Sequence, residues 1–261
     1  MSENKSGDSS KPWLSWPVEL PTVKSSLDNT LYSIINDPNY HREMAQELRA
    51  NLLKKVKSDI IDLKSDSVLL LAGGTTEDFE LYDSDTEKCE FRQESFFRYL
   101  FTINEPDCYG LIHLNKGEST VFVPEVSEDS ERWHGSRHEL IYYSNRYGVN
   151  NTHFSKDLLK YLKDNNVKHL YVLQGVNLDS GNKVKTEVKF DGIEQFTVDN
   201  TTIHPILCEL RVFKTGKEIE LMRIGNLISS QAHVYVMRHI QYGMAEMQLE
   251  AMFKSWCHFY G

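Results

Sequence analysis

A helical repeat followed at once by a short apolar run is the feature that most constrains the fold. Residues 40–57 have helical periodicity, with an apolar face that recurs every four positions: Met44, Leu48, Leu52 and Val56. Residues 67–74 follow and place five apolar residues before Gly73 and Gly74. A short apolar run of this kind predicts a buried central strand. A helix that leads into a buried strand predicts an α/β layer.

Further strands are expected downstream. Residues 109–114 and 120–123 are apolar runs joined by a polar link that contains Gly117, which predicts a β-hairpin. Residues 155–162 predict a short helix and residues 168–173 another strand. The pattern therefore indicates a single α/β domain with three or four recognisable strands and others that the pattern does not show.

Residues 91–101 contain four phenylalanines together with Arg92, Glu94 and Arg98. We predict that this stretch is a strand that enters the core and carries its charges on an exposed edge. The acidic residues 125–132 predict a solvated loop or short helix that ends at Trp133.

The character of the chain changes after about residue 205, and we expect His204 and Pro205 to lie in a linker. Thr215 and Glu218 form the pattern of a capping box, which predicts the start of a long amphipathic helix over residues 217–240. A second amphipathic helix is expected over residues 245–260.

These patterns divide the chain into three predicted parts. Residues 1–12 are polar and are expected to be disordered. Residues 13–205 form the α/β domain, and residues 206–261 are the truncated start of a second domain. We therefore predict an α/β fold, a mixed sheet flanked by helices, followed by a helical hairpin.

Composition excludes some classes of partner. The net charge of −9 argues against a general nucleic-acid binder. The four cysteines form no Cys-x-x-Cys pair, which is typical of reduced thiols in a cytoplasmic protein. No secretory leader and no run of about 18 apolar residues is visible, so we expect no membrane partner.

No complete active site can be assembled from the residues. His134 and His138 are four apart, but Gly135 and Ser136 lie between them and disfavour a helical metal site. The Gly73-Gly74 pair lacks the Gly-Lys-Ser/Thr that a phosphate loop requires, and no Gly-x-Ser-x-Gly nucleophile elbow exists. We therefore assign no catalytic residue and no metal ligand.

A series of short motifs between residues 91 and 215 nevertheless resembles a known family. The motifs are Phe-Arg-Gln-Glu-Ser-Phe-Phe (91–97), Glu-Pro (105–106), Cys-Tyr-Gly (108–110), Phe-Val-Pro (122–124), Gly-Val-Asn (175–177), Asp-Ser-Gly (179–181), Phe-Asp-Gly-Ile (190–193), His-Pro (204–205), Glu209 and Arg-Val-Phe-Lys-Thr (211–215). In this order they resemble the N-terminal half of Xaa-Pro dipeptidase, or prolidase, in the aminopeptidase P and creatinase group.

The resemblance implies a fold and a chemistry. It implies an aminopeptidase P-type N-terminal domain followed by a pita-bread catalytic domain, which begins at the helix after Lys214. Family members cleave dipeptides with a carboxyl-terminal proline and use two metal ions, usually manganese. Their ligands, two Asp, one His and two Glu, lie beyond the first two helices of that domain. The resemblance therefore places no metal ligand in this chain, which we expect to be inactive alone.

The resemblance also bears on Trp133 and Thr102. In related homodimers the N-terminal domain reaches over the partner's active site, and Trp133 matches a tryptophan of that substrate lid. The alternative is a loop tryptophan pinned to its own domain. Prolidases carry glycine where this chain has Thr102, which affects the turn after residue 101.

Two functions stay open from the sequence. The chain is either the N-terminal region of a manganese prolidase or a non-catalytic binding module. Such a module would dimerise with full-length prolidase or with another partner.

Overall fold

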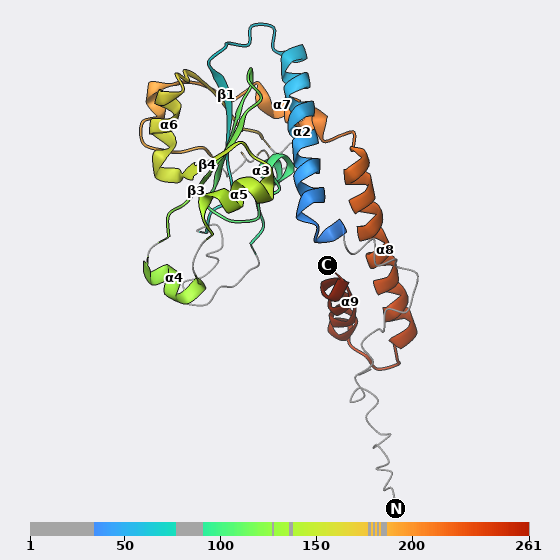
Figure 1. Ribbon diagram of the computed structural model, residues 1–261. Helices are drawn as coiled ribbons and strands as arrows, with labels where there is room; N and C mark the ends of the chain where they lie inside the picture. The colour runs from blue at the N-terminus through green and yellow to red at the C-terminus, as the bar shows by residue number, and fades with distance from the viewer. Residues whose placement is uncertain are drawn as a thin grey trace, which may run out of the picture. The chain divides into compact units, whose positions relative to one another are not determined.

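The computed structural model describes residues 34–76, 91–126, 128–135, 138–176, 179, 181, 183 and 187–260 (Figure 1). Within these ranges the chain divides into two compact units, residues 38–215 and residues 34–37 with 216–260. The predictions for residues 1–12 lie outside the described residues. The domain boundary expected at residue 205 stays a prediction, and a helix runs through that position.

Residues 38–215 contain a six-stranded mixed sheet with the strand order β4-β3-β2-β1-β5-β6. Its strands are β1 (Ser67–Ala72), β2 (Tyr109–His113), β3 (Ser119–Val123), β4 (Asn151–Phe154), β5 (His169–Val172) and β6 (Thr197–Asp199). Strand β1 is central, and four of its six residues, Val68–Leu71, are fully buried. The predicted buried strand and the hairpin of β2 and β3 are therefore confirmed.

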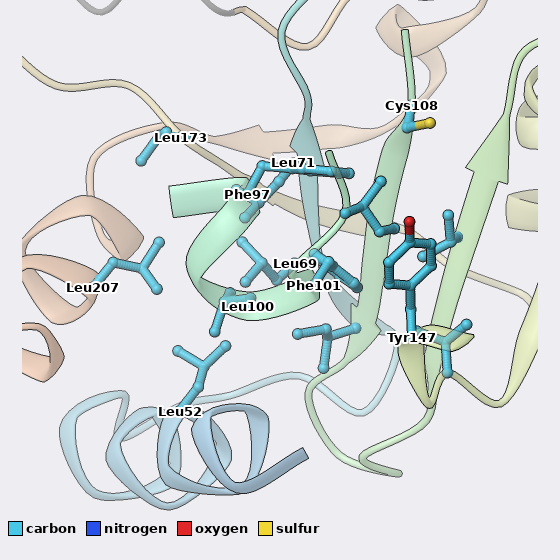
Figure 2. Close-up of a cluster of buried hydrophobic side chains, with 14 of the residues drawn as sticks. Leu52, Leu69, Leu71, Phe97, Leu100, Phe101, Cys108, Tyr147, Leu173 and Leu207 are labelled. Carbon is cyan, nitrogen blue, oxygen red and sulfur yellow. The ribbon is translucent and has the colours of Figure 1, made fainter. Parts of the chain in front are cut away.

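Helices cover both faces of this sheet (Figure 1). The helices of this unit are α2 (Pro38–Asp59), α3 (Ser95–Phe101), α4 (Glu128–His134), α5 (Leu140–Tyr147), α6 (Leu158–Asp164) and α7 (Ile203–Leu210). Helices α2, α3, α5 and α7 pack on one face around Phe97, Leu100 and Phe101 (Figure 2). Helix α6 packs on the other face through Leu158 and Leu162. The predicted α/β fold with a helix-flanked mixed sheet is confirmed.

The prediction of a strand over residues 91–101 is wrong. Residues 95–101 form helix α3, which Glu94 caps by accepting a hydrogen bond from the Phe97 amide at 2.7 Å. The apolar side chains of Phe97, Leu100 and Phe101 recur at helical spacing, and all three are fully buried. The high aromatic content of this stretch favoured a strand. The spacing of its buried residues is instead that of a helix.

The prediction that His204 and Pro205 lie in a linker is also wrong. Helix α7 begins at Ile203 and includes both residues. Pro205 is the third residue of this helix, within the first turn, where backbone amides have no partner in the helix. A proline at this position therefore does not interrupt the helix.

The second unit is a helical hairpin. Helix α8 (Gly216–His239) and helix α9 (Glu246–Tyr260) are separated by a turn in which Gly243 has a φ of +91°. Ile224, Ile228 and Tyr260 form its buried cluster. Both predicted amphipathic helices are therefore confirmed. Among the described residues, no helix combines the length and apolar character needed to cross a bilayer.

Thr102 ends helix α3 in a conformation that favours glycine. Its φ is +58°, and its amide donates to the Arg98 carbonyl oxygen at 2.8 Å. A left-handed conformation costs an L-residue about 1–2 kcal/mol. The position where this chain has threonine and prolidases have glycine is therefore the strained carboxyl-terminal cap of α3.

We expect Thr102→Gly to stabilise this unit by about 0.5–1 kcal/mol, because relief of the left-handed strain exceeds the added freedom of the unfolded chain. Urea unfolding followed by circular dichroism measures the change. Asn166→Gly is the matched control, since Asn166 has a φ of +54° and asparagine adopts this region at lower cost. A loss of stability in Thr102→Gly, or a larger gain in the control, contradicts the prediction.

Candidate functional site

The strand directions bring the ends of five strands to one edge of the sheet. Strand β1 is parallel to β5, and β5 is parallel to β6, while β3 is parallel to β4. Strand β2 is antiparallel to both β1 and β3. The carboxyl ends of β1, β3, β4, β5 and β6 therefore share an edge, where ligands commonly bind in α/β sheets. We call it the carboxyl edge.

A buried glutamine organises the loop after β1. The Gln93 side chain is only 3 % exposed, and its Oε1 accepts hydrogen bonds from the Gly74 amide at 2.6 Å and the Glu94 amide at 2.9 Å. Its Nε2 donates to the Glu105 carbonyl oxygen at 2.8 Å. One side chain therefore joins the end of β1, the start of α3 and the segment before β2.

Two acids in the segment before β2, Glu105 and Asp107, accept hydrogen bonds from neighbouring elements. The Tyr147 hydroxyl lies 2.7 Å from both carboxylate oxygens of Glu105 and donates to them. Burial and the Glu105 carboxylate raise the pKa of Tyr147, so the phenol keeps its proton. Asp107 accepts from the Thr76 amide at 3.1 Å and the Thr76 hydroxyl at 2.9 Å. Glu105 therefore joins the segment before β2 to helix α5, and Asp107 joins the same segment to the loop after β1.

His204 packs closely against Gly175, in the segment after β5. A Cβ atom on Gly175 would lie 2.3 Å from His204 Nε2, so only glycine leaves room for the imidazole. The ring of Phe96 packs against His204 with centroids 5.5 Å apart. His204 Nε2 also lies 3.5 Å from Cys208 Sγ. The prediction of a linker did not relate His204 to Cys208. Their spacing of four residues indicates that both lie on one side of a helix, but only if a helix is predicted there.

Trp133 lies on α4, which follows β3 at the carboxyl edge. Its side chain is 86 % exposed, and Figure 1 shows α4 apart from the helices that cover the sheet. The neighbouring Arg132 pairs with Asp129 at 3.0 Å on the same helix. The role of Trp133 as a substrate lid stays a prediction.

The described residues do not fit a manganese pair. Among them, no group of three or more His, Cys, Asp or Glu side chains converges in a way that could hold a metal ion. The ring of His138 instead stacks on Tyr142 with centroids 3.7 Å apart. Cys208 and Cys257 are free thiols. The described part of the carboxyl edge therefore provides loops and an exposed aromatic side chain.

The fold and this edge define an α/β domain of the aminopeptidase P type. Residues 45–171 match the family model of the aminopeptidase P N-terminal domain. Solved structures agree: E. coli aminopeptidase P with the inhibitor Pro-Leu has a TM-score of 0.62 at 22 % identity, covering 84 % of this chain and 50 % of that one. A Pseudomonas aeruginosa aminopeptidase, PepP, has a TM-score of 0.60 at 19 % identity, over 82 % of this chain and 49 % of that one.

Sequence relatives narrow the family. Xaa-Pro dipeptidases of Rattus norvegicus and Homo sapiens are each 40 % identical to this chain over 196 residues, which is 75 % of this chain and 39 % of each relative. The chain belongs to the Xaa-Pro dipeptidase and aminopeptidase P family and carries its N-terminal region. It spans about two fifths of the length of these relatives.

Proposed function

We propose that this chain supplies the N-terminal domain of a manganese-dependent Xaa-Pro dipeptidase, which hydrolyses dipeptides with a carboxyl-terminal proline. The observation that carries the proposal is a difference in identity between two kinds of relative. Mammalian Xaa-Pro dipeptidases are 40 % identical, whereas a Xaa-Pro aminopeptidase of Pyrenophora tritici-repentis is 27 % identical over a similar length. The dipeptidase is therefore favoured over the aminopeptidase.

The proposed contribution of this chain is to cover substrate. The family resemblance places all five metal ligands beyond the segment that this chain matches, so residues 1–261 alone would bind no catalytic manganese. In a homodimer, the exposed indole of Trp133 would lie over the site of the partner subunit. An aromatic face that meets the pyrrolidine of a proline substrate excludes water from it and adds contact area.

A second candidate function is a non-catalytic module that pairs with full-length prolidase. The exposure of Trp133 favours it equally, because an indole that covers a partner's site does not require catalytic residues in its own chain. The two candidates differ in one respect: only the first requires that this domain support turnover when it is joined to a catalytic half.

We expect residues 1–261 alone to give no hydrolysis of Gly-Pro above the blank at any Mn²⁺ concentration. The same residues, joined to the segment of the human Xaa-Pro dipeptidase that follows its aligned region, are expected to hydrolyse Gly-Pro when Mn²⁺ is added. Turnover by residues 1–261 alone would overturn the first expectation. A folded, metal-loaded chimera without activity, together with co-purification of residues 1–261 with the full-length human enzyme, would favour the binding module.

Trp133→Ala in the same chimera tests the proposal that Trp133 covers the substrate. Loss of an aromatic contact with substrate should raise KM by about tenfold and change kcat less. The control is Ile141→Ala, which removes another exposed apolar side chain, 61 % exposed, from α5. Equal effects of the two substitutions would exclude a specific role for Trp133.

A further inference from the structure

A polar groove lies at the edge of the sheet opposite the carboxyl edge. It runs between helix α2, the turn that joins β2 to β3, and the segment that joins α5 to β4. Its volume of about 600 Å³ is within the range of about 300–1,000 Å³ that small-molecule ligands occupy. The lining includes Arg42, Gln46, Arg49, Gly117, Gly148 and Asn150.

Two arginines of α2 bring positive charge to this groove. Arg42 and Arg49 both donate hydrogen bonds to carbonyl oxygens at the carboxyl end of α5, so they offset the negative end of that helix dipole. Neither arginine forms an ion pair with a carboxylate of the described residues. In the described part of the chain, Glu43 is the acid that lines the groove, whereas the whole chain has a net charge of −9. The groove is therefore more positive than the protein around it.

The hydrogen-bond acceptors at this end of the groove are already in use. The Ser144 carbonyl oxygen accepts from the amides of Gly148 and Val149. Asn150 Oδ1 accepts from the Ser119 amide at 2.9 Å and from the Ser119 hydroxyl at 3.2 Å. These two bonds fix the orientation of the Asn150 amide, because its nitrogen cannot take the place of an acceptor. A ligand therefore finds few acceptors at this end.

Donors remain available in the same groove. Asn150 Nδ2 has no hydrogen-bond partner among the described residues. Arg42 donates to the Asn145 carbonyl oxygen at 3.1 Å and to Asn39 Oδ1 at 2.8 Å, which leaves other N–H groups of its guanidinium for a ligand. The remaining hydrogen-bonding capacity is therefore that of a site for an acceptor.

Gly148 brings a further donor close to Arg42. A Cβ atom on Gly148 would lie 2.3 Å from Arg42 Cγ and 3.0 Å from Gln46 Nε2. The stem of Arg42 and the amide nitrogen of Gln46 therefore lie against the same backbone position. The φ of Gly148 is +60°, which also favours glycine there.

We propose that this groove binds a small organic solute through a carboxylate group. A carboxylate accepts hydrogen bonds from guanidinium and from primary amide groups, which are the donors present. Phosphate is favoured at the amino end of a helix, whereas the helix end that lines this groove is the carboxyl end of α5. The proposal is independent of the proposed peptidase function, because no lining residue belongs to the motifs that resemble prolidase.

Nuclear magnetic resonance of the complete 261-residue chain, labelled with ¹⁵N, tests the site with succinate as the probe. One charge-assisted and two neutral hydrogen bonds correspond to a dissociation constant of about 1 mM. The amide resonances of Ser119, Gly148 and Asn150 should shift and saturate together, while those of β5 stay unchanged. Inorganic phosphate should bind more weakly than succinate. Tighter binding of phosphate, or shifts that do not saturate, would show that the proposal is wrong.

Asn150→Asp changes the donor and keeps the bonds to Ser119. Aspartate retains an acceptor oxygen for Ser119 but replaces Nδ2 with a second oxygen and adds a negative charge, so succinate affinity should fall at least about tenfold. The control is Asn200→Asp, the same substitution at an exposed position that follows β6 at the carboxyl edge. Its affinity for succinate should stay within about twofold of the unchanged protein, because exposed charges at a distance are screened.

Gln46→Glu is a second variant in case Asn150→Asp disturbs the turn before β3. Gln46 is exposed on α2, and glutamate is as good a helix former as glutamine, so the fold should be kept. It should also weaken succinate binding, since it replaces a donor beside Arg42 with a carboxylate. Unchanged affinity in both groove variants, or an equal loss in Asn200→Asp, would mean that succinate does not bind in this groove.

Discussion

Gly110→Ala is expected to destabilise the α/β unit by about 3 kcal/mol, through overpacking in the core. Gly110 lies in β2, and a Cβ there would come within 2.3 Å of Phe101 Cε2 and 2.5 Å of its Cζ. Phe101 is fully buried, and its ring packs against that of Phe97 with centroids 5.3 Å apart. The ring therefore cannot swing away without displacing other core side chains. Urea unfolding, followed by circular dichroism, measures the loss.

Phe101→Leu gives the decisive comparison, because it removes the atoms that the new methyl group would meet. Alone it should cost about 1–2 kcal/mol, from lost burial and a small cavity. Combined with Gly110→Ala it should cost less than the sum of the single changes, by at least about 1 kcal/mol. Gly225→Ala in α8 is the control and should be neutral or slightly stabilising. Apart from its chain neighbours and the backbone of the helix, no atom of the described residues lies within 4 Å of the new Cβ. Additive losses in the double variant would exclude the contact as the cause.

The pairing of Gly110 with Phe101 illustrates what the sequence could and could not predict. Periodicity was sufficient for α2 and β1, because each buries a regular set of apolar positions. It misassigned α3, because a stretch this rich in aromatic residues suits a strand as well as a helix, and the cap that decides between them is a glutamate. Strands β4 and β6 are short, and none of their residues is fully buried, so their alternation carries little signal.

The candidate site was less predictable than the fold. Trp133 came from the family resemblance, because one exposed aromatic side chain in an acidic stretch has no periodic signal of its own. The hydrogen bonds of Gln93 could not be foreseen, since they join the backbone at Gly74 and Glu105, which are 19 and 12 residues away. Thr102 was recognised as a departure from the family, but only its positive φ shows that the departure is strained. Polar contacts between segments that are distant in the sequence can be predicted only once the fold is known.

Arg49 is a buried cation whose role was not predicted from the sequence. It is 5 % exposed, and its guanidinium donates to the carbonyl oxygens of Leu100 at 2.9 Å, Gly148 at 2.5 Å and Tyr147 at 3.5 Å. These carbonyls lie at the carboxyl ends of α3 and α5. The negative end of each helix dipole lies there, so a positive charge is stabilised. Burial lowers the pKa of Arg49 to about 10, so the side chain still carries its charge at neutral pH.

Arg49→Met is expected to destabilise the unit by about 3 kcal/mol, because buried carbonyl oxygens at two helix ends lose their donor at once. Arg49→Lys should cost less, since it keeps the charge but has no planar fork to reach both ends. The control is Arg42→Met: Arg42 donates to the Asn145 carbonyl oxygen at 3.1 Å in an exposed position and should cost below about 1 kcal/mol.

Hydrogen exchange distinguishes this role of Arg49 from a general loss of packing. The Thr102 amide donates to Arg98 in α3, and the Gly148 amide donates to Ser144 in α5. If Arg49 holds both helix ends, Arg49→Met should accelerate exchange at these two amides more than at the amides of β1. Arg42→Met should leave the Thr102 amide unchanged, because Arg42 makes no hydrogen bond to α3 among the described residues. Uniform acceleration throughout the unit would show that Arg49 acts by filling space, and that the charge at the two helix ends contributes little.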